Sequence, residues 1–256
     1  MIDIHSHIIW EVDDGASDIE ESLVMLEAAW QSGTTDIVAT PHLNDRFAYQ
    51  AELTEQRAAE LAARVAGKPR IHRGCEVHLN VDNVEQVRRS PASYTINGTQ
   101  YLLVEMPNFH VGRHVETVLK QLIAEGISPI VAHPERNPVL QKNRQMLEGW
   151  VELGCLLQLT ALSVTGGFGG PAKAASTWLL RRGLAHIVAS DSHDPVRRHP
   201  RLKEAYSEVS SSYGTDYADA LFRDNPRNIL DGVSAAGGRQ VFEKSSSRWW
   251  QFWQRT

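Results

Sequence analysis

The chain has 256 residues, of which 42% are hydrophobic, so it can bury one large core and is too apolar to be disordered. Its formal net charge of −5 gives no basic field for holding nucleic acid non-specifically. The sequence shows no signal peptide and no apolar run long enough to span a bilayer. With only two cysteines, Cys75 and Cys155, the composition predicts a protein of the reducing cytoplasm.

The first predicted strand, residues 2–5, ends in a pair of histidines, His5 and His7. Side chains two apart in a strand point to the same face, so both imidazoles lie on one side of the strand end. Such a pair is a ready set of metal ligands. In the loop that follows, Asp14 is the expected further ligand, and its neighbour Asp13 is the alternative or a turn residue.

Apolar strand-like runs then alternate with amphipathic helical ones along the chain. The further predicted strands are residues 36–39, 70–76, 101–105, 127–132, 155–159 and 185–189. The predicted helices are residues 18–32, 48–66, 113–125, 144–153 and 172–182. About seven β-α units, with strands that show little alternation, predict a parallel sheet that is buried on both faces.

Three local signals refine this outline. Ser17 and Glu20 form a capping box for the first helix. Asn97-Gly98, between two short β-like runs, is typical of a hairpin turn. The glycine-rich residues 166–170 lack the Lys-Ser/Thr of a P-loop, so we interpret them as a flexible crossover before the helix that begins at residue 172.

Metal-ligand types recur at or just past the ends of the predicted strands. They are His5, His7, Asp14, His42, Glu76, Glu105, His133, Asp191 and His193. A lone histidine is usually a hydrogen-bonded ring, and a lone carboxylate is usually part of an ion pair. For this set, such an explanation would have to hold separately for every residue, each of them by chance at a strand end. Because all strand ends of a barrel meet at one mouth, the pattern favours a barrel over an open sheet.

Mixed imidazole and carboxylate ligands suit Mn²⁺, Fe²⁺ or Zn²⁺, and this many ligands allow two or three ions. Glu76 is the natural bridge, since one carboxylate can span two ions. A thiolate phosphatase is excluded, because it needs Arg six residues after Cys, where this chain has Val81 and Ala161.

These motifs resemble the PHP superfamily of phosphoesterases, and within it the bacterial tyrosine-protein phosphatases of capsule and exopolysaccharide loci. The similar stretches are Asp13-Asp14-Gly15-Ala16, Ala39-Thr40-Pro41-His42, His133-Pro134-Glu135-Arg136 and Ala189-Ser190-Asp191-Ser192-His193. The resemblance runs from residue 2 to about residue 231, and it implies a distorted (β/α)7 TIM-like barrel. We expect one catalytic barrel over residues 1–243 and a basic, Trp-rich tail over residues 244–256.

The resemblance also implies the contents of the site. It implies a first ion on His5, His7, Glu76 and Asp191, a second on Glu76, Glu105 and His133, and a third on Asp14, His42 and His193. Manganese is the expected metal, with iron or zinc as alternatives. Two phosphate-binding arginines are implied, Arg136 and Arg198, with the adjacent Arg197 as the alternative to the latter.

The implied reaction is hydrolysis of a phosphate monoester, in which a metal-bound hydroxide attacks phosphorus. The implied substrate is a phosphotyrosine protein, and the implied partner is a bacterial tyrosine kinase of polysaccharide export. Where the family often has Ile-Leu-Pro-Gly-Ile, this chain has Ile8-Ile9-Trp10-Glu11-Val12. We expect Trp10 either to line the mouth of the barrel and stack on an aryl substrate or to pack on the rim.

Three alternatives stay open. Another PHP enzyme, such as a histidinol phosphatase, would use the same ions on a small phosphomonoester. An amidohydrolase also uses His-x-His, but many of those need a strand lysine that the predicted strands lack. A non-catalytic scaffold would dock a kinase or polymer-assembly partner, and the tail would offer it a docking segment or a peripheral membrane contact. Self-association into a homo-oligomer is left open by the sequence.

Overall fold

The computed structural model describes residues 1–107 and 111–235, so the predicted tail and the end of the predicted barrel domain lie outside the described residues. The strands are β1 (Ile2–Ser6), β2 (Asp36–Ala39), β3 (His42–Leu43), β4 (Arg70–Arg73), β5 (Glu76–His78), β6 (Tyr101–Glu105), β7 (Ser128–Ala132), β8 (Leu156–Thr160) and β9 (Ile187–Ala189).

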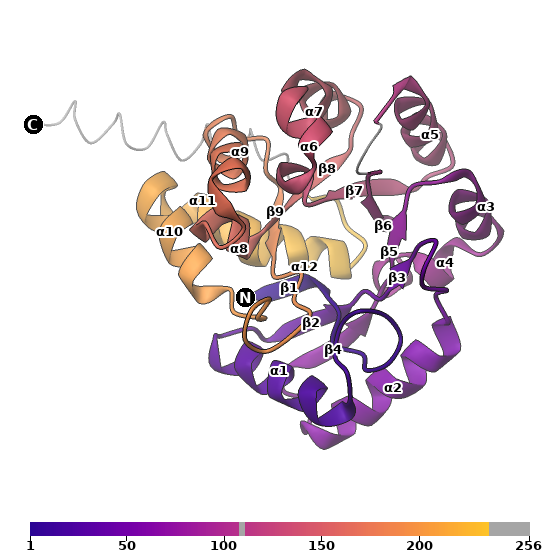
Figure 1. The fold of residues 1–256 in the computed structure, drawn as a ribbon, viewed down its shortest axis with the longest axis vertical. Helices are drawn as coiled ribbons and strands as arrows, with labels where there is room; N and C mark the ends of the chain where they lie inside the picture. Colours follow the sequence, from indigo (N-terminus) through magenta and orange to yellow (C-terminus); the bar gives the residue numbers. More distant parts are fainter. Residues whose placement is uncertain (108–110, 236–256) are drawn as a thin grey trace, which may run out of the picture.

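Helices follow most strands and surround them (Figure 1). The longer ones are α1 (Ile19–Gln31), α2 (Ala51–Arg64), α3 (Val81–Arg89), α5 (Arg113–Ala124), α7 (Arg144–Glu152), α9 (Gly169–Arg181) and α10 (Lys203–Tyr213). The shorter ones are α4 (Pro91–Tyr94), α6 (Pro138–Lys142), α8 (Ala161–Thr165), α11 (Thr215–Asp219) and α12 (Asn225–Leu230), with helical turns η1 (Ile96–Gly98), η2 (Pro134–Arg136) and η3 (Ala220–Asp224).

The strands are parallel and close into a ring. One sheet has the order β1-β2-β4 and the other β3-β5-β6-β7-β8-β9. Strand β3 continues β2 after two residues, and β5 continues β4 after two residues, so each pair acts as one bent strand. The ring closes where the Asp191 N–H donates to the His5 carbonyl and the His7 N–H donates to the Ser192 carbonyl, each at 2.8 Å. The predicted seven-stranded distorted barrel is thereby confirmed.

The predicted strand over residues 70–76 is wrong in one respect, because it is broken at Gly74. A Cβ at Gly74 would lie 3.2–3.3 Å from side-chain atoms of Val38, Thr40 and Ile96. Glycine therefore lets the bent strand approach its neighbours at the point where β4 ends and β5 begins.

Three local predictions also need correction. The cap of α1 is Asp18, whose carboxylate accepts from the Glu21 N–H at 2.8 Å, and Glu21 accepts from the Ser17 N–H. Asn97 and Gly98 do adopt positive φ, but they join α4 to β6 and form no hairpin. Helix α9 begins at Gly169, three residues before the predicted start.

The inside of the barrel is apolar below its mouth. On β6, Leu103 belongs to the inner cluster with Ile130 of β7, whereas Leu102 and Val104 pack in the cluster that includes the surrounding helices. Leu230 of α12 joins the inner cluster from the opposite end. Burial of both strand faces confirms the prediction from the Val/Ile/Leu-rich runs.

Polar groups also close the end of the barrel that lies opposite the mouth. Asp36, at the start of β2, is fully buried and accepts from Arg70 Nε, His72 Nε2 and Arg227 Nη2 at 2.8–2.9 Å. Burial alone would raise the pKa of Asp36, but these donors hold it well below its usual range. This arrangement ties α12 to β2 and β4.

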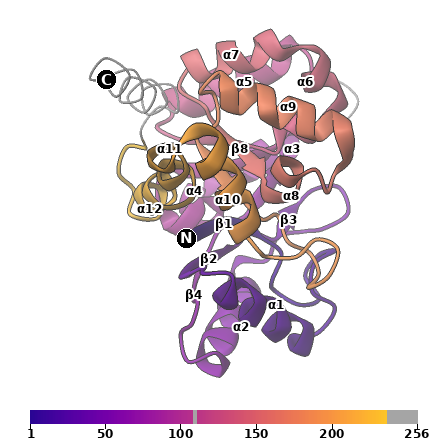
Figure 2. The ribbon, with the colours of Figure 1, turned by 90° about the vertical axis from the view of Figure 1, so that its left-hand side faces the viewer.

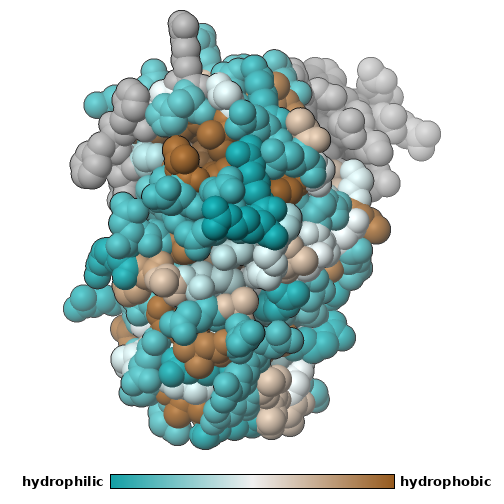
Figure 3. All heavy atoms as spheres, turned by 90° about the vertical axis from the view of Figure 1, so that its right-hand side faces the viewer, coloured by the Kyte–Doolittle hydropathy of each residue, from teal (hydrophilic) through white to brown (hydrophobic). Residues whose placement is uncertain are grey.

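The helices lie at two ends of the molecule, and one of its faces carries no large apolar patch among the described residues. Figure 2 shows α1 and α2 at one end of the molecule and α5, α6, α7 and α9 at the other. The face in Figure 3 is mostly hydrophilic, with its hydrophobic residues in small, separate groups. Within the described residues, no helix is both long enough and apolar enough to cross a bilayer.

Candidate metal centre

All nine ligand candidates from the sequence gather at the C-terminal mouth of the barrel. They form four overlapping groups in which the potential ligand atoms lie within 4.8 Å of one another. The groups are His5–His7–Glu76, His5–His133–Asp191, His42–Glu76–Glu105 and His7–Asp14–His42–His193. Segments from one end of the described chain to the other thus meet in a single pocket of nitrogen and carboxylate-oxygen atoms.

Glu76, the first residue of β5, lies at the centre of these groups and is fully buried. Its Oε1 is 2.8 Å from His133 Nε2, and its Oε2 is 3.2 Å from His5 Nε2 and 3.0 Å from His42 Nδ1. One carboxylate therefore faces imidazoles from three strand ends, which is the position that a ligand shared between two cations needs.

Two ligand positions differ from the grouping that the family resemblance implies. Glu105, the last residue of β6, lies with Glu76 and His42, and its Oε2 is 3.3 Å from His78 Nδ1. His133 contacts Glu76 but groups with His5 and Asp191. Both residues still face the shared Glu76, so the set is the expected one and the subdivision is different.

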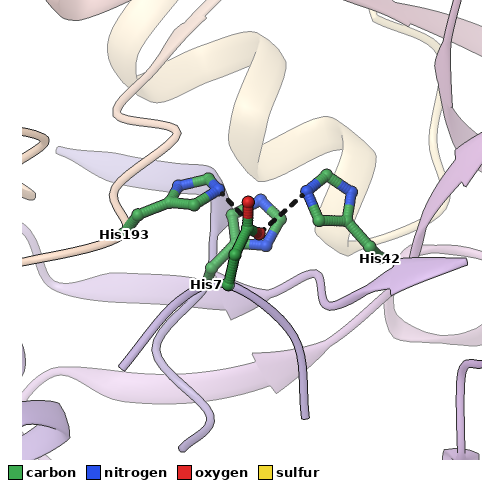
Figure 4. Close-up of side chains that lie close together, drawn as sticks. His7, His42 and His193 are labelled. Carbon is green, nitrogen blue, oxygen red and sulfur yellow. Dashed lines mark ion pairs between the residues drawn. The ribbon is translucent and has the colours of Figure 1, made fainter. Parts of the chain in front are cut away.

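The outermost group is centred on Asp14. Its Oδ1 lies 3.3 Å from His42 Nε2 and 3.4 Å from His193 Nε2 (Figure 4). The ring centroid of His7 is 3.9 Å from that of His193. Because 44% of the Asp14 side chain is exposed, this group is the side of the centre that solvent and a ligand can reach.

Asp13 serves a different purpose from Asp14. Its Oδ2 accepts from His7 Nδ1 at 2.7 Å and from the His42 N–H at 3.0 Å. It therefore holds His7 with Nε2 directed into the centre, as carboxylates behind metal-bound histidines commonly do. Two residues later, position 15 must be glycine, because a Cβ there would lie 2.1 Å from the His7 carbonyl oxygen.

Gln158 of β8 orients His5 in the same way, and sequence reasoning missed it. Its Oε1 lies 2.9 Å from His5 Nδ1, and its amide Nε2 donates to the Leu159 carbonyl. The available signal was a single amide inside an otherwise apolar predicted strand. A buried polar side chain in that position needs a partner.

Backbone conformation also helps to turn ligands inward. His133 and Asp191 have φ values of 31° and 50°, in a region that residues other than glycine rarely adopt. Each residue lies just after a strand, β7 or β9. Unusual backbone at strand ends that carry reactive side chains is typical of functional sites.

The donors suit cations. His42 Nδ1 and Glu76 Oε2 face each other at 3.0 Å, yet neither makes a hydrogen bond to any described residue. Burial lowers the pKa of His193 to about 4, so this imidazole is neutral as metal coordination requires. Burial and the charge of His7 would also lower the pKa of His42, but hydrogen bonds and charge interactions with Asp14 and Glu76 outweigh them and raise this pKa to about 9.

The two arginines meet beside the centre. Arg136 Nη1 donates to Asp191 Oδ2, and Arg198 Nη2 donates to the same oxygen at 2.8 Å. Arg197 is exposed, and its backbone N–H donates to Asp194. Of the two alternatives, Arg198 is therefore the one that faces the centre.

A cavity of about 120 Å³ opens next to these groups. It is lined by Glu105, Met106, Ala132, His133, Arg136 and Asn137. Trp10 does not belong to this lining. Its ring packs against the Arg57 guanidinium at 4.8 Å, and its carbonyl accepts from the same side chain, so it packs on the rim.

The cysteines take no part in the centre. Both are buried. Burial raises the pKa of Cys155 to about 12, so its thiol stays protonated at neutral pH. Both cysteines therefore pack as small apolar residues.

Comparisons with known proteins place this geometry in a family. Residues 1–231 match the family described as capsular polysaccharide synthesis, CpsB/CapC. The tyrosine-protein phosphatase CpsB of Streptococcus pneumoniae is 34% identical over 242 residues, covering 90% of this chain and 98% of its own. The tyrosine-protein phosphatase YwqE of Bacillus subtilis is 34% identical over 220 residues, covering 84% and 86%.

A solved structure gives the same result. It comes from work on YwqE and CpsB, described as unique metal-dependent tyrosine phosphatases. It superposes with a TM-score of 0.86 at 33% identity, covering 92% of this chain and 96% of its own. The chain belongs to the CpsB/CapC family of capsular polysaccharide synthesis proteins.

Proposed function

We propose that this protein is a metal-dependent phosphatase that hydrolyses phosphotyrosine in proteins and thereby regulates capsule or exopolysaccharide synthesis. Its relatives are named tyrosine-protein phosphatases, and its solved neighbour is described as metal-dependent. The observation that carries the proposal is the convergence of nine potential ligands and two arginines at one barrel mouth.

In this proposal three cations occupy the centre, with manganese favoured and iron or zinc as alternatives. His5, His7, Glu76 and Asp191 hold the first, Glu76, Glu105 and His133 the second, and Asp14, His42 and His193 the third. Glu76 belongs to two of the four ligand groups, which supports shared coordination by its carboxylate. Bound ions would supply an activated water at neutral pH and neutralise charge on the phosphate.

The protein's own side chains bind and orient the ester. Arg136 and Arg198 present guanidinium groups to the phosphate oxygens, and Asp191 fixes both of them through one carboxylate oxygen. Arg198 Nε is buried and has no hydrogen-bond partner among the described residues, so it has a donor to offer. A tyrosine leaving group, with a pKa of about 10, needs little help from a protein acid.

The physiological partner that we propose is a bacterial tyrosine kinase of polysaccharide export, met in the cytoplasm. The support is the capsular polysaccharide description of the family. We also propose that residues 1–243 form the catalytic unit and that the basic, Trp-rich residues 244–256 dock a partner or a membrane surface.

The test is a metal analysis of purified protein combined with turnover of an aryl phosphate, a phosphotyrosyl peptide and histidinol phosphate. Glu105→Ala and His133→Ala should lose metal and activity, whereas His114→Ala, on exposed α5 surface, should retain both. Unchanged activity in the first two variants would remove the proposed site. Preference for histidinol phosphate would reassign the substrate, and no turnover at all would favour a scaffold.

A further inference from the structure

The glycine-rich residues 166–170 form the closed turn after α8 and the first two residues of α9. The N–H groups of Gly166 and Gly167 both donate to the Leu162 carbonyl, at 3.0 and 2.7 Å, and the Gly169 N–H donates to the Gly166 carbonyl at 3.0 Å. Gly166 has a φ of +96°, and a Cβ at Gly167 would lie 3.0 Å from Leu162 Cδ2. The turn therefore needs glycine, and Phe168 carries its one large side chain.

The ring of Phe168 lies against both arginines of the site. Its centroid is 4.4 Å from Arg136 Cζ and 5.9 Å from Arg198 Cζ. The two arginines come from different parts of the barrel, since Arg136 ends η2 and Arg198 follows β9. One aromatic ring and one carboxylate, Asp191, thus hold both guanidinium groups.

This arrangement addresses an electrostatic problem. Two guanidinium groups that share one carboxylate oxygen repel each other, and only about a quarter of each side chain is exposed (28% for Arg136 and 26% for Arg198). The negative face of an aromatic ring stabilises such cations without using their N–H donors. The donors that do not point at Asp191 therefore stay available for an anion.

We propose that Phe168 is a positioning residue, an aromatic platform that holds Arg136 and Arg198 in the orientation that receives the phosphate group. The inference rests on the proposed phosphatase function. It assigns the glycine-rich segment a role in phosphate binding through its one aromatic side chain and not through its backbone amides.

The experiment compares Phe168→Leu, which keeps an apolar side chain of similar reach, with Phe168→Tyr, which keeps the ring. Binding of inorganic phosphate to the metal-loaded protein is measured by calorimetry, beside metal content, the denaturation midpoint, and kcat and KM for para-nitrophenyl phosphate. We expect Phe168→Leu to weaken phosphate binding by roughly 3- to 30-fold and to raise KM, with metal content unchanged. Phe168→Tyr should bind phosphate like the wild type.

A double-mutant cycle separates positioning from packing. In an Arg198→Ala background, the effect of Phe168→Leu on phosphate affinity should shrink, because one of its two targets is gone. Wild-type phosphate affinity in Phe168→Leu, equal losses in Leu and Tyr variants, or full additivity with Arg198→Ala would overturn the inference. A wild-type protein that binds phosphate but turns over no phosphate ester would instead refute the proposed function and leave the platform standing.

Discussion

Both ends of the barrel bury carboxylates, but the two ends differ in how fully those carboxylates are paired with hydrogen-bond donors. At the closed end, Asp36 accepts hydrogen bonds from two arginines and a histidine that belong to the chain itself. At the mouth, Glu76 and Asp191 face imidazoles, and several of the buried polar atoms around them have no hydrogen-bond partner among the described residues. Buried charge that the protein pairs completely is structural, whereas buried charge that it leaves partly unpaired prepares a site for a ligand.

The largest expected effect is at the mouth. Glu76→Gln keeps the size of the side chain but removes the negative charge that two of the four ligand groups share. We expect loss of bound metal and a fall in aryl phosphatase activity of at least about 100-fold. Elemental analysis and initial rates check this, with the exposed helix residue Glu85→Gln as the control. Normal metal content and normal activity in Glu76→Gln would show that the buried charge at the mouth does not bind metal, and would contradict the contrast between the two ends of the barrel.

The matching change at the closed end is Asp36→Ala. It leaves Arg70, His72 and Arg227 without their common acceptor, so we expect a loss of about 2–4 kcal/mol in the free energy of unfolding. Metal content and activity of the folded protein should be preserved. Asp231→Ala is the control, because this exposed carboxylate also faces Arg227, at 3.9 Å, and should cost less than about 1 kcal/mol.

A smaller effect is expected from the carboxylate behind His7. Asp13→Ala should lower metal affinity or activity by roughly 10- to 100-fold, because the imidazole loses the group that orients it. Asp13→Asn keeps an oxygen that can accept from His7 Nδ1 and should recover part of the loss. Metal titration of both variants measures this. If Asp13→Ala bound metal as tightly as the wild type, Asp13 would be only a turn residue.

The last expected effect is on stability and comes from the protonation of a buried histidine outside the metal centre. His186, just before β9, is buried and its Nδ1 accepts from the Leu157 N–H at 3.2 Å; burial lowers its pKa to about 4. Between pH 6.5 and about 4 the unfolded chain binds a proton that the folded protein does not. The free energy of unfolding therefore falls as the pH is lowered through that window, and at pH 5 the loss is about 2 kcal/mol.

Urea denaturation at about pH 7.5 and about pH 5 measures this term. His186→Asn, which keeps an acceptor near the Leu157 N–H, should lose less stability on acidification than the wild type. The histidines at the mouth are present in both proteins, so their contribution to acid sensitivity cancels when the two stability losses are subtracted. Equal acid sensitivity in both would show that His186 takes up its proton without unfolding.

Much of the fold and the donor set could be predicted from the sequence, for a physical reason. Residues such as His5, Glu105 and His193 follow apolar runs, and in a parallel barrel such positions must converge. Orienting groups could not be predicted as readily, because Gln158 lies 153 residues from its partner His5 in the chain. The break at Gly74 was hidden for the same reason, since it depends on the close approach of β2.

The positions of the short helices and the cap of α1 were also beyond the sequence signals. Asp18, not Ser17, supplies the capping oxygen, because either side chain is chemically suited and only the path of the preceding loop decides. Phe168 was overlooked because its neighbours are glycines, which drew attention to the backbone and away from the ring.

The seam that closes the barrel has a consequence for how the molecule is held together. Four residues exchange backbone hydrogen bonds across it, and three of them, His5, His7 and Asp191, are also among the candidate ligands. A cation bound by them would link the first strand to the segment that follows the last. Metal binding would then stabilise the closed barrel, so the free energy of unfolding and the fraction of active protein would rise together.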